Sequence, residues 1–225
     1  MLVAAAVCPH PPLLVPELAG AAAAELDGLR AACAAAVGAL RDAGPDVLLV
    51  VGGADQDVTY GADAAGSLAP WGLDVRTGRG EPVLPLSLSI GRWLLERERL
   101  TASAFHAVSF DAAPAECAAL GERLAAAAGR VAMLVMADGS ACLTEKSPGY
   151  LDPRAQPYNA AIVEALARAE APALAELDAG EAAGLWVAGR AALQVLGGAA
   201  SPLNGEILYD GAPYGVGYFV ARWTG

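Results

Sequence analysis

Short apolar runs separated by longer alanine- and leucine-rich segments form the dominant pattern of this chain. The runs Leu2–Val7, Val47–Val51 and Val131–Met136 are continuous rather than alternating. Continuous apolar runs of this length are typical of parallel strands that are buried on both faces of a sheet. A fourth strand is predicted over Ala104–Phe110.

The segments between these runs predict helices, because alanine and leucine favour helix and Gly44-Pro45 ends the first segment. The predicted helices are approximately Ala19–Ala43, Leu88–Leu100, Ala113–Ala128, Ala155–Ala169, Pro172–Leu177 and Gly180–Leu196.

Two further features complete the predicted fold. Residues 54–85 are predicted to form a long loop, and Glu206–Asp210 with Tyr214–Trp223 an antiparallel hairpin around a Gly-Ala-Pro turn. Strands that alternate with helices predict an α/β protein with a mostly parallel central sheet flanked by helices. The C-terminal strand pair closes it as an α/β sandwich. We expect one domain over residues 1–225.

Composition narrows the classes of partner. The chain is 56% hydrophobic and 17% charged, which allows a large core, and its net charge is -11. An acidic chain repels phosphate backbones, so no nucleic-acid partner is expected. No basic amphipathic segment or long uncharged apolar run indicates a membrane partner. Scattered cysteines and the lack of a signal-peptide pattern are typical of a cytoplasmic protein with reduced thiols.

A histidine between prolines is the first candidate for chemistry. His10 lies in the segment Cys8-Pro9-His10-Pro11-Pro12, directly after the first predicted strand. Ligands of open α/β sheets bind beyond the carboxyl ends of the strands, so this histidine is a candidate metal ligand or acid/base group. The alternative is a loop histidine bonded to backbone. The other histidine, His106, lies within a predicted strand and is expected to be a satisfied or half-exposed structural residue.

A second polar segment follows the strand that ends at Met136. Its residues Asp138, Ser140, Glu145 and Lys146 come close together at the same predicted edge of the sheet. Such a loop can bind a small anion or supply a carboxylate ligand. It can equally be a surface loop held by Glu–Lys and Asp–Arg pairs.

The glycine pair after the second strand is a third candidate. Gly52-Gly53 would let a ligand approach the backbone, although neither dinucleotide nor phosphate-loop spacing is present. Asp55 or Asp57 could ligate a metal or stabilise a turn. Glu206 and Tyr214 are weaker candidates. The predicted pocket therefore comprises His10, Gly53, Asp55, Asp138, Ser140, Glu145 and Lys146, with His10 as the single metal-ligand position.

The opening Pro9–Glu17 resembles the start of the LigB-like class III extradiol ring-cleavage dioxygenases, and of the Memo-like proteins that share their fold. Weaker similarity extends over most of the chain, through Val131–Leu143, Tyr150–Arg154 with Tyr158 and Asn159, and Tyr209–Phe219. The resemblance implies an iron(II) ion held by two histidines and a glutamate, and a third histidine that acts as acid/base on a catechol.

The chain departs from that pattern at several positions. His10 matches the first ligand, but Gly52-Gly53-Ala54 stands where the second should follow, and Ala141 stands where the acid/base histidine should be. Only apolar, glycine and arginine residues occur over Val187–Arg190, where Memo-like relatives carry another polar residue. The reaction of the family uses three histidines, and this chain has two.

Two functions remain from this comparison. The first is a divergent member that keeps the fold and pocket, lacks the complete iron site, and binds a small molecule or runs another reaction, with no cofactor or a weakly bound divalent metal. The second is a metal-dependent oxidoreductase, a ring-cleaving dioxygenase with a site rebuilt from His10 plus Asp55, Asp138 or Glu206. A structural role as a homo-oligomer is a third possibility.

Overall fold

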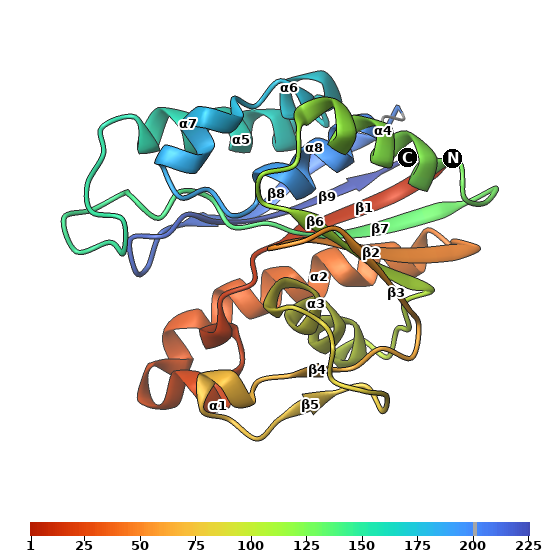
Figure 1. Ribbon diagram of the computed structural model, residues 1–225, viewed down its shortest axis with the longest axis horizontal. Coiled ribbons are helices and arrows are strands. Elements are labelled where there is room, and N and C mark those ends of the chain that lie inside the picture. The colour runs from red at the N-terminus through yellow and green to blue at the C-terminus, as the bar shows by residue number, and fades with distance from the viewer. Residues whose placement is uncertain (200–201) are drawn as a thin grey trace.

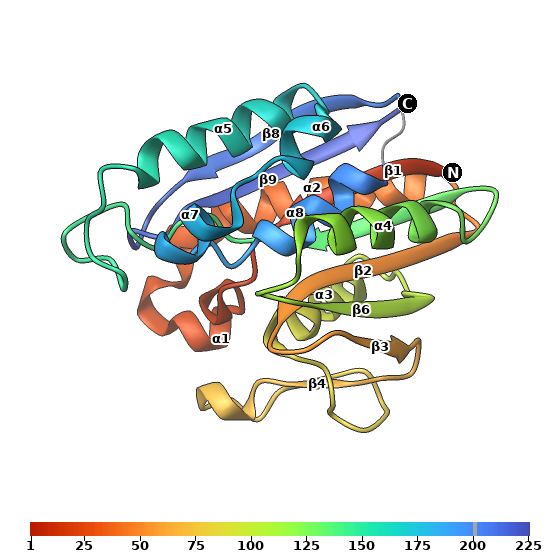
Figure 2. The same ribbon diagram turned by 45° about the horizontal axis from the view of Figure 1, so that its top comes forward.

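The sheet is built from the runs that the hydrophobic pattern singles out. The computed structural model describes residues 1–199 and 202–225. Seven strands form one sheet in the order β3-β6-β2-β7-β1-β9-β8 (Figure 2). The four central strands are parallel: β6 (Ala104–Ser109), β2 (Val47–Ala54), β7 (Val131–Met136) and β1 (Leu2–Cys8).

Antiparallel strands close both ends of the sheet. β3 (Val58–Gly61) pairs with β6, β9 (Tyr218–Thr224) pairs with β1, and β8 (Asn204–Gly211) pairs with β9. A separate small sheet joins β4 (Gly66–Ser67) to β5 (Arg76–Thr77). The predicted α/β class, with a mostly parallel sheet and a C-terminal antiparallel pair, is confirmed.

Helices cover both faces of the sheet (Figure 1). One face carries α2 (Asp27–Asp42) and α3 (Leu86–Arg97). The other carries α4 (Pro114–Ala125), α5 (Ala155–Ala167), α6 (Ala171–Ala175), α7 (Ala179–Gly184) and α8 (Arg190–Gly198). The remaining short elements are α1 (Pro16–Ala19) and the 3-10 turns η1 (Pro12–Leu14), η2 (Gly20–Leu26) and η3 (Ala69–Trp71).

The sheet separates two apolar cores, because successive side chains of a strand point to opposite faces. In β1, Ala4 and Ala6 pack toward α2 and α3, whereas Ala5 and Val7 pack toward α4 to α8. Every cysteine is buried and free, and Cys33 and Cys117 pack in the two cores on opposite faces of the sheet.

Three predicted segments differ from the structure. The predicted helix Ala19–Ala43 begins as the 3-10 turn η2, because Gly20 at φ 55° breaks the chain after α1. The predicted helix Gly180–Leu196 is two helices, α7 and α8, with Trp186 at φ 54° between them. The predicted loop 54–85 contains β3, a short edge strand whose side chains are mostly exposed and so lack the apolar signal of a buried strand.

Across the described ranges, none of the helices is of a length and apolar character that would let it span a membrane.

Candidate functional site

β1 and β7 are parallel neighbours, and the chain leaves their carboxyl ends toward opposite faces of the sheet. After β1 the chain continues to α2 on one face, and after β7 it continues to α5 on the other. Ligands of open α/β sheets bind in the crevice that such a divergence leaves. The parallel register pairs Cys8 with Met136, so two residues further on His10 lies opposite Asp138.

His10 and Asp138 contact each other directly. The backbone N–H of His10 donates to Asp138 Oδ1 at 2.7 Å, and His10 Nδ1 lies 3.6 Å from the same oxygen. His10 is only 5% exposed. Its Nδ1 is fully buried and has no hydrogen-bond partner within the described residues. A buried polar atom left unpaired typically costs about 1–3 kcal/mol, so this arrangement is not explained by stability.

The carboxyl group of Asp138 is perturbed by its surroundings. Burial raises the pKa of Asp138 above its ordinary value, while the charge of His10 and the backbone hydrogen bond from His10 oppose that change. A carboxyl group whose pKa moves toward neutrality, beside an imidazole at a strand end, is the kind of pair that handles protons in active sites.

Tyr218 is a third member of this site, and the sequence did not single it out. β9 runs antiparallel to β1 with Val7 opposite Ala221, and continuing that register brings Tyr218 opposite His10. The N–H of Gly139 donates to the carbonyl of Gly217 at 2.7 Å, which joins the two loops beside it. Burial and then the charge of Asp138 raise the pKa of Tyr218 well above its usual range. The sequence could have identified Tyr218 through its place at the start of a strand that pairs antiparallel with the first predicted strand.

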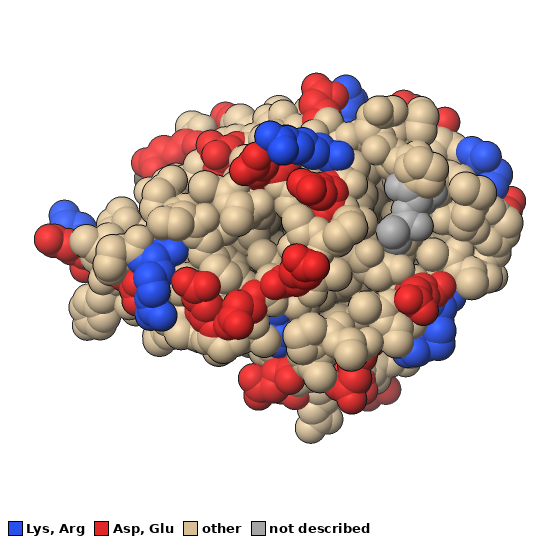
Figure 3. All heavy atoms as spheres, turned by 90° about the horizontal axis from the view of Figure 1, so that it is seen from above, with Lys and Arg blue, Asp and Glu red and all other residues tan. Residues whose placement is uncertain are grey.

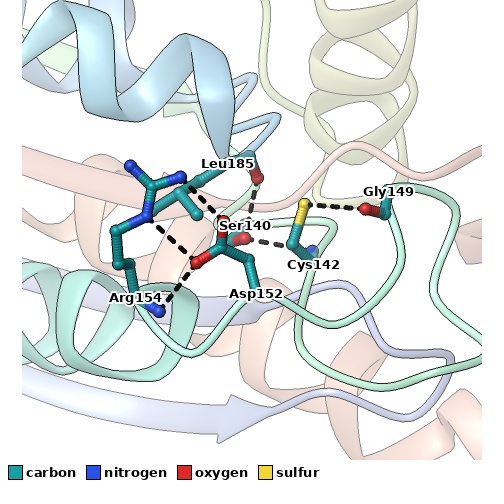
Figure 4. A network of polar contacts seen from close by, with 6 residues as sticks. All are labelled: Ser140, Cys142, Gly149, Asp152, Arg154 and Leu185. Carbon is teal, nitrogen blue, oxygen red and sulfur yellow. Dashed lines mark hydrogen bonds and ion pairs between the residues drawn. The ribbon is translucent and has the colours of Figure 1, made fainter.

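Hydrogen bonds within the loop after β7, and from this loop to Leu185, hold it in place (Figure 4). The Ser140 hydroxyl donates to the carbonyl of Leu185 at 2.7 Å and accepts from the N–H of Cys142 at 3.0 Å. Asp152 pairs with Arg154 at 2.7 Å, as the structural alternative for this loop predicts. The hydroxyl of Ser140 therefore already donates one hydrogen bond and accepts another within the fold.

Glu145 and Lys146 do not join His10. Both are exposed, and within the described residues neither forms an ion pair, so the predicted Glu–Lys pair is absent there. Glu206 instead pairs with Arg222 at 2.6 Å on the C-terminal hairpin. The polar cluster that the sequence suggests is therefore dispersed in space.

The glycine pair has a packing role in the structure. A Cβ atom at Gly52 would lie 2.6 Å from Ser87 Oγ, and one at Gly53 would lie 2.5 Å from Phe110 Cε1. Asp55 is exposed, and Asp57 accepts from the N–H of Ser109 at 2.6 Å, a bond to the end of β6 rather than within its own turn. Neighbouring side chains thus occupy the space that the sequence interpretation left for a ligand.

The residues do not fit the iron site that the family resemblance implies. A facial triad needs two histidines and a carboxylate around one point. Over residues 1–199 and 202–225, no group of three or more His, Cys, Asp or Glu side chains could hold a metal ion. Beyond the ends of β1 and β7, His10 and Asp138 lie together, and two donors do not make that triad.

A pocket at His10 stays a prediction. A cavity of about 710 Å³ lies near Met1, Asp42 and Arg222, and one of about 430 Å³ lies near His106. Neither is lined by His10 or Asp138. Ligand access to the His10–Asp138 pair therefore needs a direct test.

Asp138→Asn is expected to raise the free energy of unfolding at pH 7. Because burial raises the pKa of Asp138 in the folded state, ionisation destabilises the fold as pH rises from the ordinary value of 3.8 through the raised one. Asparagine can still accept the His10 N–H but carries no charge. The gain should be about 1.4 kcal/mol per unit of pKa change and should vanish at low pH.

Urea denaturation of both proteins between acidic and neutral pH measures this difference. Asp42→Asn, at a side chain that is 74% exposed, serves as the control and should show little pH-dependent difference. Equal stability of wild type and Asp138→Asn across the whole pH range would contradict a raised pKa of Asp138 in the folded state.

The fold is similar to that of a solved but uncharacterized protein. A crystal structure of an uncharacterized protein, JW3007, from Escherichia coli K12 matches with a TM-score of 0.58 at 14% sequence identity, covering 99% of this chain and 100% of that chain. No protein-family model matches the sequence, and no curated protein matches it. At this identity the likeness shows the fold alone, so the function must be argued from the site.

Proposed function

We propose that this protein binds a small molecule at the meeting point of β1 and β7, and that the His10–Asp138 pair exchanges a proton with it. This role replaces the iron-dependent ring cleavage of the family that the sequence resembles. The observation that supports it is the buried Nδ1 of His10, unpartnered within the described residues and 3.6 Å from Asp138 Oδ1.

The geometry suits a histidine oriented by a carboxylate. A shift of about 0.6 Å would bring Nδ1 within hydrogen-bond distance of Asp138. Asp138 would then fix the orientation and tautomer of the ring, as carboxylates do beside catalytic histidines. Of the two ring nitrogens only Nδ1 is both fully buried and unpaired within the described residues, which leaves Nε2 to meet a ligand.

Charge favours a small neutral or cationic ligand over a polyanion. Acidic side chains outnumber basic ones on the face drawn in Figure 3, in keeping with the net charge of -11. Extended phosphate backbones are repelled by such a surface. The aromatic diols that the family resemblance implies carry no net charge at neutral pH and are therefore the first compounds to test.

Titration with catechol is expected to shift the NMR ring signals of His10. The chain has two histidines, so a His106→Asn variant assigns both sets of signals. Asp138→Asn should weaken binding at least about tenfold, because hydrogen bonds to charged groups contribute about 1.5–3 kcal/mol. If neither catechol nor any member of a set of small phenols and hydroxy acids moves the His10 signals, the proposed binding role is wrong.

Metal content separates this proposal from the metal-dependent alternative. After anaerobic incubation with Fe(II) and desalting, we expect mass spectrometry to find far less than one metal ion per chain, and the same amount in His10→Ala. About one ion per chain in the wild type, lost in His10→Ala, would instead support an oxidoreductase with a rebuilt site at His10 and Asp138.

A further inference from the structure

The second histidine lines a cavity away from the candidate site. This cavity of about 430 Å³ lies between α4, the edge strand β3 and its neighbour β6. His106 and Thr59, which are direct partners in the β3–β6 register, both line it. α4 contributes Glu116, Cys117, Ala119, Leu120 and Arg123 to its lining. α4 therefore forms one wall of the cavity, which lies beside the edge of the sheet at β3.

His106 is a buried polar group with one nitrogen left for a ligand. It is 9% exposed, and its Nδ1 lies 3.1 Å from Thr59 Oγ1. No hydrogen bond of its Nε2 to another described residue is present. Burial lowers the pKa of His106, so the ring is neutral at pH 7 and can donate or accept one hydrogen bond in the cavity.

The charges that line this cavity are separated by sign. Asp57 and Glu116 each use one carboxylate oxygen to accept a backbone N–H, from Ser109 at 2.6 Å and from Ala113 at 3.2 Å. Both carboxylates are close enough to the buried Cys117 to raise the pKa of its thiol, to which burial contributes most. The negatively charged end of the cavity, formed by Asp57 and Glu116, therefore lies near the start of α4.

Arg123 supplies the opposite charge at the other end. It follows Glu116 by seven positions on α4, a rise of about 10 Å along the helix axis. It lines the cavity, and no ion pair of Arg123 occurs within residues 1–199 and 202–225. The cavity lining thus carries two carboxylates at one end, a guanidinium at the other end and a neutral imidazole.

We propose that this cavity binds a small zwitterion, with its ammonium group at Asp57 and Glu116 and its carboxylate at Arg123. His106 lines the same cavity, so a ligand that joins the two ends would change the surroundings of its ring. A simple anion would meet the two carboxylates, and a simple cation would leave Arg123 without a partner. A metal ion is a poorer occupant, because no three donors converge within the described residues.

Titration with unbranched amino acids of increasing length tests this site. Glycine, γ-aminobutyrate and ε-aminocaproate are added separately, with hexylamine and hexanoate as singly charged controls. We expect ε-aminocaproate to shift the NMR ring signals of His106 saturably and to leave those of His10 unchanged. The site does not depend on the His10 proposal, since His10 is not among the cavity residues.

Charge variants on α4 make the test specific. Arg123→Gln should raise the Kd for ε-aminocaproate at least about fivefold and leave hexylamine binding unchanged. Glu116→Gln should weaken the binding of both hexylamine and ε-aminocaproate and preserve the helix, since glutamine Oε1 can also accept the N–H of Ala113. Glu122→Gln, the same change at an exposed position of α4 outside the cavity, should have no effect. Absence of a His106 shift with every compound, equal binding of hexylamine and ε-aminocaproate, or an inert Arg123→Gln would overturn the proposal.

Discussion

Gly121→Ala is expected to lower the free energy of unfolding by about 3 kcal/mol, the upper part of the range for overpacked cores. Gly121 lies where α4 crosses α8, and a Cβ atom there would overlap the carbonyl oxygen of Val195 and lie 2.7 Å from the nitrogen of Ala199. The reciprocal contact is equally close, because a Cβ at Gly198 would lie 2.5 Å from Ala118 Cα. These neighbours are backbone atoms, so the helices themselves must separate.

Gly38→Ala provides a matched control with the opposite sign. Gly38 lies within α2, and the nearest atom to an added Cβ is the end of the Arg41 side chain at 3.6 Å. Alanine should therefore raise the free energy of unfolding by about 0.5–1 kcal/mol through helix propensity. Urea denaturation of both variants gives the comparison. A Gly121→Ala variant as stable as Gly38→Ala would show that α4 and α8 are not in backbone contact in solution.

The strands were predictable because their apolar runs are continuous and short. Val131–Met136 is observed with the predicted bounds, and β1 extends the predicted strand by one residue to Cys8. Their order was not predictable, since it depends on which face each crossover helix covers. The packing role of the glycines at the end of β2 was not predictable, because the approach of Phe110 to Gly53 depends on the loop after β6.

The site was predictable in part. His10 and Asp138 both follow buried strands, which placed them at one edge of the sheet. That they touch follows only from the adjacency of β1 and β7, which lie far apart along the chain. Tyr218 comes near Asp138 because β9 returns antiparallel beside β1, and no local pattern marks that return. His106 was predicted to be structural, and its bond to Thr59 agrees, but the cavity beside it needed α4 in place.

Arg190→Met is the second substitution for which we expect a large loss of stability, about 3 kcal/mol. Arg190 is 4% exposed, and its guanidinium donates to the carbonyls of Ala112, at 2.6 Å, and Phe110, and to Gln194 Oε1 at 2.9 Å. Methionine keeps much of the side-chain volume but leaves these three acceptors without their donor. Each lost hydrogen bond from a charged group contributes about 1.5–3 kcal/mol before relaxation.

Desolvation of the Arg190 guanidinium opposes its hydrogen bonds, and the balance of the two decides whether Arg190→Met destabilises the fold. Burying a guanidinium requires desolvation, and replacing buried charges with apolar residues is neutral or stabilising in some proteins. Here the apolar replacement does not match its surroundings, because carbonyl groups of the loop after β6 remain in the protein interior. Arg41→Met, at a side chain that is 54% exposed, should change stability by less than about 0.5 kcal/mol. Urea denaturation could instead show Arg190→Met to be as stable as Arg41→Met. In that case the desolvation of Arg190 balances its hydrogen bonds, and the loop after β6 packs against α8 without them.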